Sequence, residues 1–150
     1  MKNKFILISM RQDYFYNGKE LRFCIDTKLI DWVSSLGFQP LLVSDIKTLN
    51  FFLKQNKFKI KGILLSGGND INKNSLRYKI EKRLTDISKN KKIPLLGICH
   101  GLQFINFIEK GTLKKIKNHV GVNHKIKSNS NYPLKVNSFH ENGIKKLGRN

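Results

Sequence analysis

Apolar and polar residues follow one another along the chain in segments of two kinds. Four short apolar runs have the length and composition of buried parallel strands, and they lie at residues 4–9, 39–43, 60–70 and 93–99. Between and after them, apolar residues recur at steps of three and four, which predicts helices at about residues 21–36, 46–56, 76–87 and 100–108. Strands that alternate with helices predict an α/β domain with a mainly parallel sheet and helices on both faces.

Particular residues set the expected helix ends and inward faces. Gly37 is a natural stop for the first helix, and Ser75 is a suitable N-terminal cap for the third. Cys24 lies on the apolar stripe that begins at Leu21, so we expect it to be a buried core residue. The lysine-rich residues 109–132 are expected to form a loop. The residues expected to face inward on the last helix are Leu102, Ile105 and Ile108.

Length and composition limit the fold to one unit. With 150 residues, 39% of them hydrophobic, the chain predicts a single domain over residues 1–150. No apolar run approaches the roughly 20 residues that cross a bilayer, and the first apolar run is too short for a signal peptide. The two cysteines have no disulfide or metal-site spacing and suit a reducing compartment. We therefore expect a cytoplasmic protein without a membrane partner.

The formal net charge of +19 raises the question of nucleic-acid binding. The lysines are scattered over every polar segment and form no basic stripe or known binding motif, so a solvated surface is the favoured interpretation. A positive field of this kind would still attract an anionic small molecule.

The segment GICHG combines a cysteine with two flanking glycines. Cys99 stands two residues from Gly97 and from Gly101, after an apolar strand and before an amphipathic helix. A sharp turn from strand to helix exposes a nucleophile, and the amides at the helix start stabilise a thiolate and an oxyanion. The alternative is that Cys99 is a small buried residue at a strand end.

A second candidate segment, SGGND, follows the third predicted strand. Gly67 and Gly68 can turn their backbone N–H groups toward a ligand, because glycine permits close approach. The alternative is an ordinary turn before a helix. Both this loop and GICHG fall at the carboxyl edge of the predicted sheet, where ligand sites form in such folds.

These features together resemble the class I glutamine amidotransferase fold, and within it the free-standing γ-glutamyl hydrolases of the peptidase C26 type. The resemblance covers essentially the whole chain and implies a flavodoxin-like sheet with Cys99 as nucleophile. It implies an oxyanion hole from Gly67, Gly68 and the backbone of His100. The segments that carry it are GILLSGGNDI, Arg77 with Glu81, IPLLGICHGLQFIN, EKGTL, NHVGVNHKI and VNSFHENGI. The residues that it assigns to substrate binding are Gln103, Asn137, Ser138 and His140.

The reaction that the resemblance implies is hydrolysis of a γ-glutamyl amide or phosphoramidate through a cysteine thioester, with release of glutamate and with no metal or cofactor. The pattern is most similar to hydrolases of a γ-glutamyl nucleotide amidate in capsule phosphoramidate biosynthesis, and a nucleotide-linked substrate would suit the charge. The alternatives are a glutaminase subunit of an amidotransferase and a catalytically inactive domain that binds a glutamyl group. The sequence leaves the leaving group and the oligomeric state open.

The sequence departs from the family near its C-terminus, where members carry a His-Pro-Glu signature that completes the catalytic triad. His140 and Glu141 are neighbours and would project to opposite faces of an extended segment. His119 and His124 are expected to be surface residues of the lysine-rich loop. We therefore expect a fold that is incomplete at the C-terminus and a chain that, as given, is a poor catalyst or none.

Overall fold

The computed structural model describes residues 4–55, 57–126 and 134–149. The chain divides into two compact units, a first unit of residues Met1–Ile105 and a second unit of residues Asn106–Asn150. In the described part of the chain, no helix is both long and apolar enough to cross a membrane.

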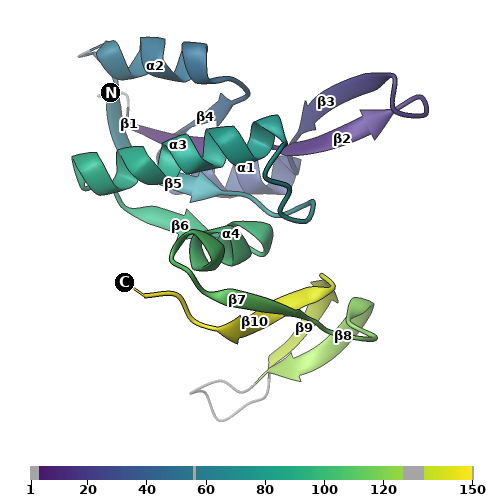
Figure 1. Ribbon diagram of the computed structural model, residues 1–150. Helices are drawn as coiled ribbons and strands as arrows, with labels where there is room; N and C mark the ends of the chain where they lie inside the picture. Colours follow the sequence, from purple (N-terminus) through teal and green to yellow (C-terminus); the bar gives the residue numbers. More distant parts are fainter. Residues whose placement is uncertain (1–3, 56, 127–133, 150) are drawn as a thin grey trace. The chain divides into compact units, whose positions relative to one another are not determined.

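The first unit is built on a four-stranded parallel sheet in the order β4-β1-β5-β6 (Figure 1). The two central strands carry the most buried side chains, among them Leu7, Ile8 and Leu65. Their continuous apolar runs are what a strand covered on both faces requires. The predicted parallel sheet is confirmed. Its strands are β1 (Lys4–Ser9), β4 (Gln39–Val43), β5 (Lys59–Leu65) and β6 (Leu95–Gly97).

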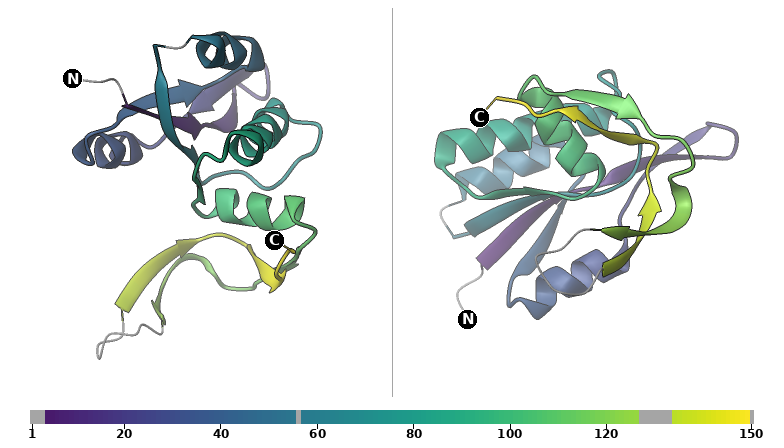
Figure 2. Two further views of the ribbon diagram at one scale, coloured as in Figure 1. Left: turned by 90° about the vertical axis from the view of Figure 1, so that its left-hand side faces the viewer. Right: turned by 90° about the horizontal axis from the view of Figure 1, so that it is seen from below.

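Helices cover both faces of this sheet (Figure 2). On one face Val33 of α1 packs against Ile8 and Leu64. On the other face the side chain of Ser9 contacts Glu81 of α3, because neighbouring residues of a strand point to opposite sides. The helices are α1 (Thr27–Ser35), α2 (Ile46–Lys54), α3 (Leu76–Lys91) and α4 (His100–Ile108). Ser75 caps α3 as expected, with its hydroxyl accepting from the Tyr78 N–H.

The predicted first helix is wrong over its first residues, which form the second strand of a hairpin. Strand β2 (Arg11–Phe15) pairs antiparallel with β3 (Glu20–Cys24), and α1 begins only at Thr27. The turn between the strands contains Asn17 and Gly18 at positive φ, the pair most typical of tight hairpins. Cys24 therefore ends a strand and is only half-buried, so its placement on a helix is also wrong.

The second unit consists of two antiparallel pairs, β7 (Thr112–Lys115) with β10 (Asn142–Lys146) and β8 (Val120–Ile126) with β9 (Leu134–Phe139). The predicted loop over 109–132 is thus wrong for β7 and β8, and residues 127–132 lie outside the described residues. The buried side chain of Asn106 ties this unit together. Its Nδ2 donates to the Lys146 carbonyl at 3.2 Å, and its Oδ1 accepts from the Gly148 N–H at 2.9 Å.

The inward face of α4 differs from the expectation. Leu102 is 50% exposed, whereas Phe104 is completely buried. The buried side chains include His100, Gln103 and Phe104, which recur at helical steps, and Asn106 near the end of the helix. His100 is buried on this face because its ring binds the Glu81 carboxylate of α3.

Candidate active site

Cys99 lies at the turn from β6 to α4. Its φ is +52°, a left-handed conformation that non-glycine residues rarely adopt, and its side chain is exposed. The backbone on either side is fixed, since the Ile98 N–H donates to the Leu65 carbonyl at 3.0 Å and the Gln103 N–H donates to the Cys99 carbonyl at 3.1 Å. The turn therefore presents the thiol outward at the helix start, which is the geometry of a nucleophile elbow.

The two flanking glycines make this turn compact. A Cβ on Gly97 would lie 2.6 Å from the Gly101 carbonyl oxygen, and a Cβ on Gly101 would lie 2.7 Å from the Leu65 Cβ. Real Cβ atoms do not approach other atoms so closely, so the crossing of strand and helix backbones at this point requires glycine at both positions.

The loop after β5 runs beside Cys99. A Cβ on Gly67 would lie 3.6 Å from the Cys99 Cβ, and Gly68 has a φ of +123°. Among the described residues, neither the Gly68 N–H nor the His100 N–H has a hydrogen-bond acceptor. These two amides are therefore available to a negatively charged oxygen.

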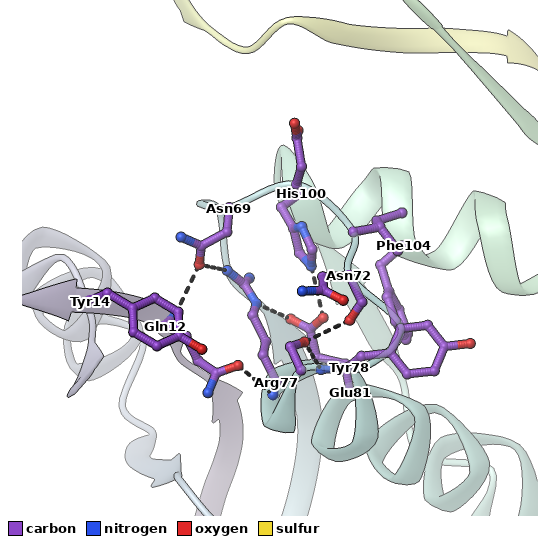
Figure 3. Close-up of a pocket in the computed structure, with 12 residues that line it drawn as sticks. Gln12, Tyr14, Asn69, Asn72, Arg77, Tyr78, Glu81, His100 and Phe104 are labelled. Atoms are coloured by element: carbon purple, nitrogen blue, oxygen red, sulfur yellow. Dashed lines mark hydrogen bonds and ion pairs between the residues drawn. The ribbon is translucent and has the colours of Figure 1, made fainter. Parts of the chain in front are cut away.

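A network of buried charges joins Arg77, Glu81 and His100 (Figure 3). The Glu81 carboxylate is completely buried and is surrounded by three groups at 2.8 Å: the Ser9 hydroxyl and the Arg77 Nε at Oε1, and the His100 Nε2 at Oε2. Because an ionised carboxylate only accepts hydrogen bonds, His100 Nε2 carries the proton of this contact. Side chains from β1, α3 and α4 thus meet at a single carboxylate.

Contacts within the network keep Glu81 and Arg77 ionised. Burial raises the pKa of the Glu81 carboxyl, but the hydrogen bond from His100 and the charge of Arg77 lower it by more, so its pKa lies below the ordinary value. Burial lowers the pKa of the Arg77 guanidinium, and Glu81 opposes that shift. The pair is ionised at neutral pH, as a buried salt bridge requires.

The guanidinium of Arg77 also reaches the glycine loop. Its Nη2 donates to the Ser66 carbonyl at 2.7 Å and to the Gly67 carbonyl at 3.2 Å. The sequence pattern indicated Arg77 and Glu81 only within the family resemblance, without a role for either. A signal was present, because the two charges are four residues apart on the same stripe as Ile80 and Leu84, and charges on an apolar stripe are paired.

A cavity of about 190 Å³ adjoins the network (Figure 3). Its wall is formed by His100, Arg77 and Glu81 together with polar and aromatic side chains. Among the described residues, His100 Nδ1 has no hydrogen-bond partner. The further residues that line the cavity include Gln12, Tyr14, Asn69, Asn72, Tyr78 and Phe104.

The residues that the resemblance assigns to the site fall into two groups. Gln103 is buried on α4, one helical turn after Cys99, in the same unit as Gly67, Gly68 and His100. The others belong to the second unit: Asn137 and Ser138 are neighbours on β9, and His140 follows that strand. Asn137 is exposed and Ser138 is buried, so their side chains point to opposite faces of the strand pair.

Three histidines of the second unit form a cluster. The ring centroid of His119 lies 4.6 Å from that of His124 and 4.7 Å from that of His140. The His140 Nδ1 donates to the Asn142 carbonyl at 2.9 Å. His119 lies in the loop between β7 and β8, as expected, whereas His124 lies on β8, and both side chains are half-buried. Across the described residues, no group of three or more His, Cys, Asp or Glu side chains is arranged to hold a metal ion.

From this cluster we predict that His119 is protonated less readily than an ordinary histidine. Partial desolvation lowers the pKa of His119, and the charges that His124 and His140 acquire at acid pH lower it further. We expect the NMR titration of the His119 ring to have a midpoint below the ordinary value of about 6.5. In a His124→Gln variant the midpoint should rise, because one repelling charge is lost. A His119 midpoint at or above the ordinary value in the wild type would contradict the cluster.

Comparison with known proteins places these features in a family. The family model described as glutamine amidotransferase class-I matches residues 25–147. A γ-glutamyl-CDP-amidate hydrolase of Campylobacter jejuni is 38% identical over 118 residues, which cover 75% of this chain and 56% of that protein. A subunit of the glutamine-hydrolyzing GMP synthase of Methanococcus aeolicus is 49% identical over 53 residues, which cover 35% of this chain and 24% of that protein.

Solved structures share the fold. A putative GMP synthase subunit from Thermoplasma acidophilum matches with a TM-score of 0.62 and 20% identity, over 98% of this chain and 69% of that one. A glutamine amidotransferase from Thermotoga maritima matches with a TM-score of 0.60 and 15% identity, over 98% of this chain and 64% of that one. The chain therefore spans just over half the length of the Campylobacter jejuni protein and about two thirds of each of these two solved chains.

Proposed function

This chain belongs to the class I glutamine amidotransferase family, and we propose that it hydrolyses a γ-glutamyl amide or phosphoramidate through a thioester on Cys99. The observation that carries the proposal is the elbow, which holds an exposed thiol at positive φ between β6 and α4. An inert core cysteine would need neither exposure nor a strained backbone.

The groups around Cys99 support the first step of that reaction. The Cys99 sulfur attacks the γ-carbonyl carbon, and the negative oxygen that forms accepts hydrogen bonds from the Gly68 and His100 amides, which have no acceptor among the described residues. The carbon–nitrogen bond then breaks, and the leaving nitrogen takes a proton. Water attacks the thioester, which releases glutamate and restores the thiol. Gln103, Asn137, Ser138 and His140 are the proposed contacts to the glutamyl group.

We propose that the substrate carries a nucleotide, as in capsule phosphoramidate biosynthesis. The name of the Campylobacter jejuni relative denotes hydrolysis of a γ-glutamyl-CDP-amidate, and its match covers three quarters of this chain. The net charge of +19 would favour the approach of an anionic nucleotide over that of neutral glutamine.

A trapping experiment tests the thioester. The chain is mixed with γ-glutamyl-CDP-amidate or with glutamine, quenched in acid at short times and analysed by intact-protein mass spectrometry and peptide mapping. We expect a glutamyl adduct on Cys99 that forms faster from the nucleotide amidate. The adduct should be absent in Cys99→Ala, because no other thiol occupies the elbow.

The second cysteine provides the matched control. Cys24→Ala removes the thiol at the end of β3, outside the elbow, so this variant should form the adduct at the wild-type rate. An adduct that maps to Cys24, or none from either substrate, would refute the proposed function.

A glutaminase subunit is the second candidate, because the glutamine-hydrolyzing GMP synthase of Methanococcus aeolicus has a subunit that matches one third of this chain at high identity. With that function the substrate would be glutamine itself. An adduct that forms faster from glutamine than from the nucleotide amidate would favour this function over the first.

A further inference from the structure

We propose that Arg77 and Glu81 are positioning residues that orient the two amides of the oxyanion hole; this inference rests on the proposed function. Both side chains are almost completely buried, at 3% and 0% exposure, and their guanidinium and carboxylate are 2.8 Å apart. Although both line the cavity beside the network, this burial leaves them almost no surface for contact with a substrate. Each instead holds one of the two segments that flank the Cys99 thiol.

Arg77 acts on the glycine loop. In a planar trans peptide the C=O and the following N–H point in opposite directions. Since Arg77 Nη2 binds the Gly67 carbonyl, the Gly68 N–H points away from the guanidinium. Two successive glycines allow this peptide to rotate, because neither has a Cβ that restricts its backbone. The guanidinium selects one of the orientations and thereby leaves the Gly68 N–H without an acceptor among the described residues, in the loop whose Gly67 lies beside Cys99.

Glu81 acts on the elbow. One of its oxygens holds Arg77 and Ser9, and the other holds the ring of His100, the residue directly after Cys99. The His100 side chain is 3% exposed, so its ring has a fixed position, and its backbone N–H is fixed with it. A single carboxylate therefore couples the glycine loop to the elbow, and both oxyanion donors depend on it.

A second contact, made by Ser9, fixes the start of the glycine loop. The Ser9 hydroxyl accepts from the Ser66 N–H at 3.1 Å and donates to Glu81 Oε1. The residue before the glycine pair is thus bound at its N–H by Ser9 and at its carbonyl by Arg77. The freedom of the loop is confined to the Gly67–Gly68 peptide, where Arg77 makes its longer contact.

The role of Arg77 can be separated from general stability with two reactions of the same thiol. The first is acylation by γ-glutamyl p-nitroanilide: a sulfur–carbon bond forms, the carbon–nitrogen bond breaks, and p-nitroaniline leaves with a proton from solvent. The second is alkylation by iodoacetamide, in which sulfur displaces iodide. Only the first develops an oxyanion at the attacked carbon, so only the first uses the two amides.

The variant Arg77→Lys keeps a positive charge for Glu81. It lacks the guanidinium nitrogen Nη2 that donates to the Ser66 and Gly67 carbonyls. We expect the saturating acylation rate to fall about 10- to 100-fold, which is somewhat less than the fall that follows removal of a complete oxyanion donor. The half-saturating substrate concentration should change little. The alkylation rate should stay within about twofold. Glu81→Gln should give the same pattern, and Arg22→Lys, at an exposed ion pair, should change neither rate.

The outcomes distinguish the two hypotheses. If the wild type is alkylated but not acylated, the proposed function fails, and this inference fails with it. If the wild type is acylated and Arg77→Lys is acylated as fast, the positioning role is refuted while the function stands. An equal fall of both rates in Arg77→Lys and Glu81→Gln would likewise refute it, because general distortion would then be the cause.

Discussion

Replacing Glu81 with alanine is expected to lower the free energy of unfolding by roughly 3–5 kcal/mol, the usual cost of removing one partner from a buried ion pair. The substitution leaves the Arg77 guanidinium buried without its carboxylate and takes the acceptor from Ser9 and His100. Urea unfolding followed by the fluorescence of Trp32, the only tryptophan of the chain, measures the change.

An exposed ion pair of the same unit is the matched control. Glu20 and Arg22 are joined at 2.7 Å, but their side chains are 46% and 45% exposed. Glu20→Ala should therefore leave the unfolding midpoint almost unchanged, since solvent screens such a pair. A loss in Glu81→Ala no larger than that in Glu20→Ala would show that the buried network does not hold the fold together.

Replacing Gly101 with alanine is expected to lower the free energy of unfolding. The loss should lie at the upper end of the roughly 1–3 kcal/mol that overpacking costs. The new Cβ would collide with the Leu65 carbonyl and side chain, and backbone atoms of a central strand cannot move aside. The elbow would also have to open, so adduct formation on Cys99 should fall in the same variant. Urea unfolding and the trapping experiment measure the two effects.

Gly62 offers a control within the same sheet. A Cβ there would meet only the Ile6 Cδ1 closely, at 2.9 Å, and the end of a flexible side chain can turn away. Gly62→Ala should therefore cost less than about 1 kcal/mol and leave adduct formation intact. Equal losses in both variants would contradict the claim that the elbow requires glycine because two backbones cross there.

The sheet could be predicted from the sequence because its central strands are covered on both faces and read as unbroken apolar runs, such as FILI in β1. The strands outside the parallel sheet could not be predicted in this way. Leu21 and Cys24 fit the helical spacing, yet the Asn17–Gly18 turn makes them part of a hairpin. In β7 and β8, frequent lysines and exposed positions remove the alternation that usually reveals a strand.

Part of the candidate site could likewise be predicted from the sequence, and part could not. The elbow at Cys99 could be predicted because its signal, two glycines and the nucleophile, is contained in five consecutive residues. The Glu81 network could not, because it joins Ser9, Arg77 and His100 from three separate elements. The contact of His119 with His124 and His140 was missed for a related reason, since strand pairing and not sequence spacing brings the rings together.

The position of β1 in the middle of the sheet has a consequence during synthesis on the ribosome. β1 precedes both of its partners by a long stretch of chain: Phe5 pairs with Gln39, and Leu7 pairs with Ile63. The hairpin of β2 and β3 can close locally as soon as it emerges, whereas β1 must wait, unpaired, for both neighbours. The nascent chain therefore exposes the apolar run of β1 to aggregation and to chaperones until β5 has left the exit tunnel.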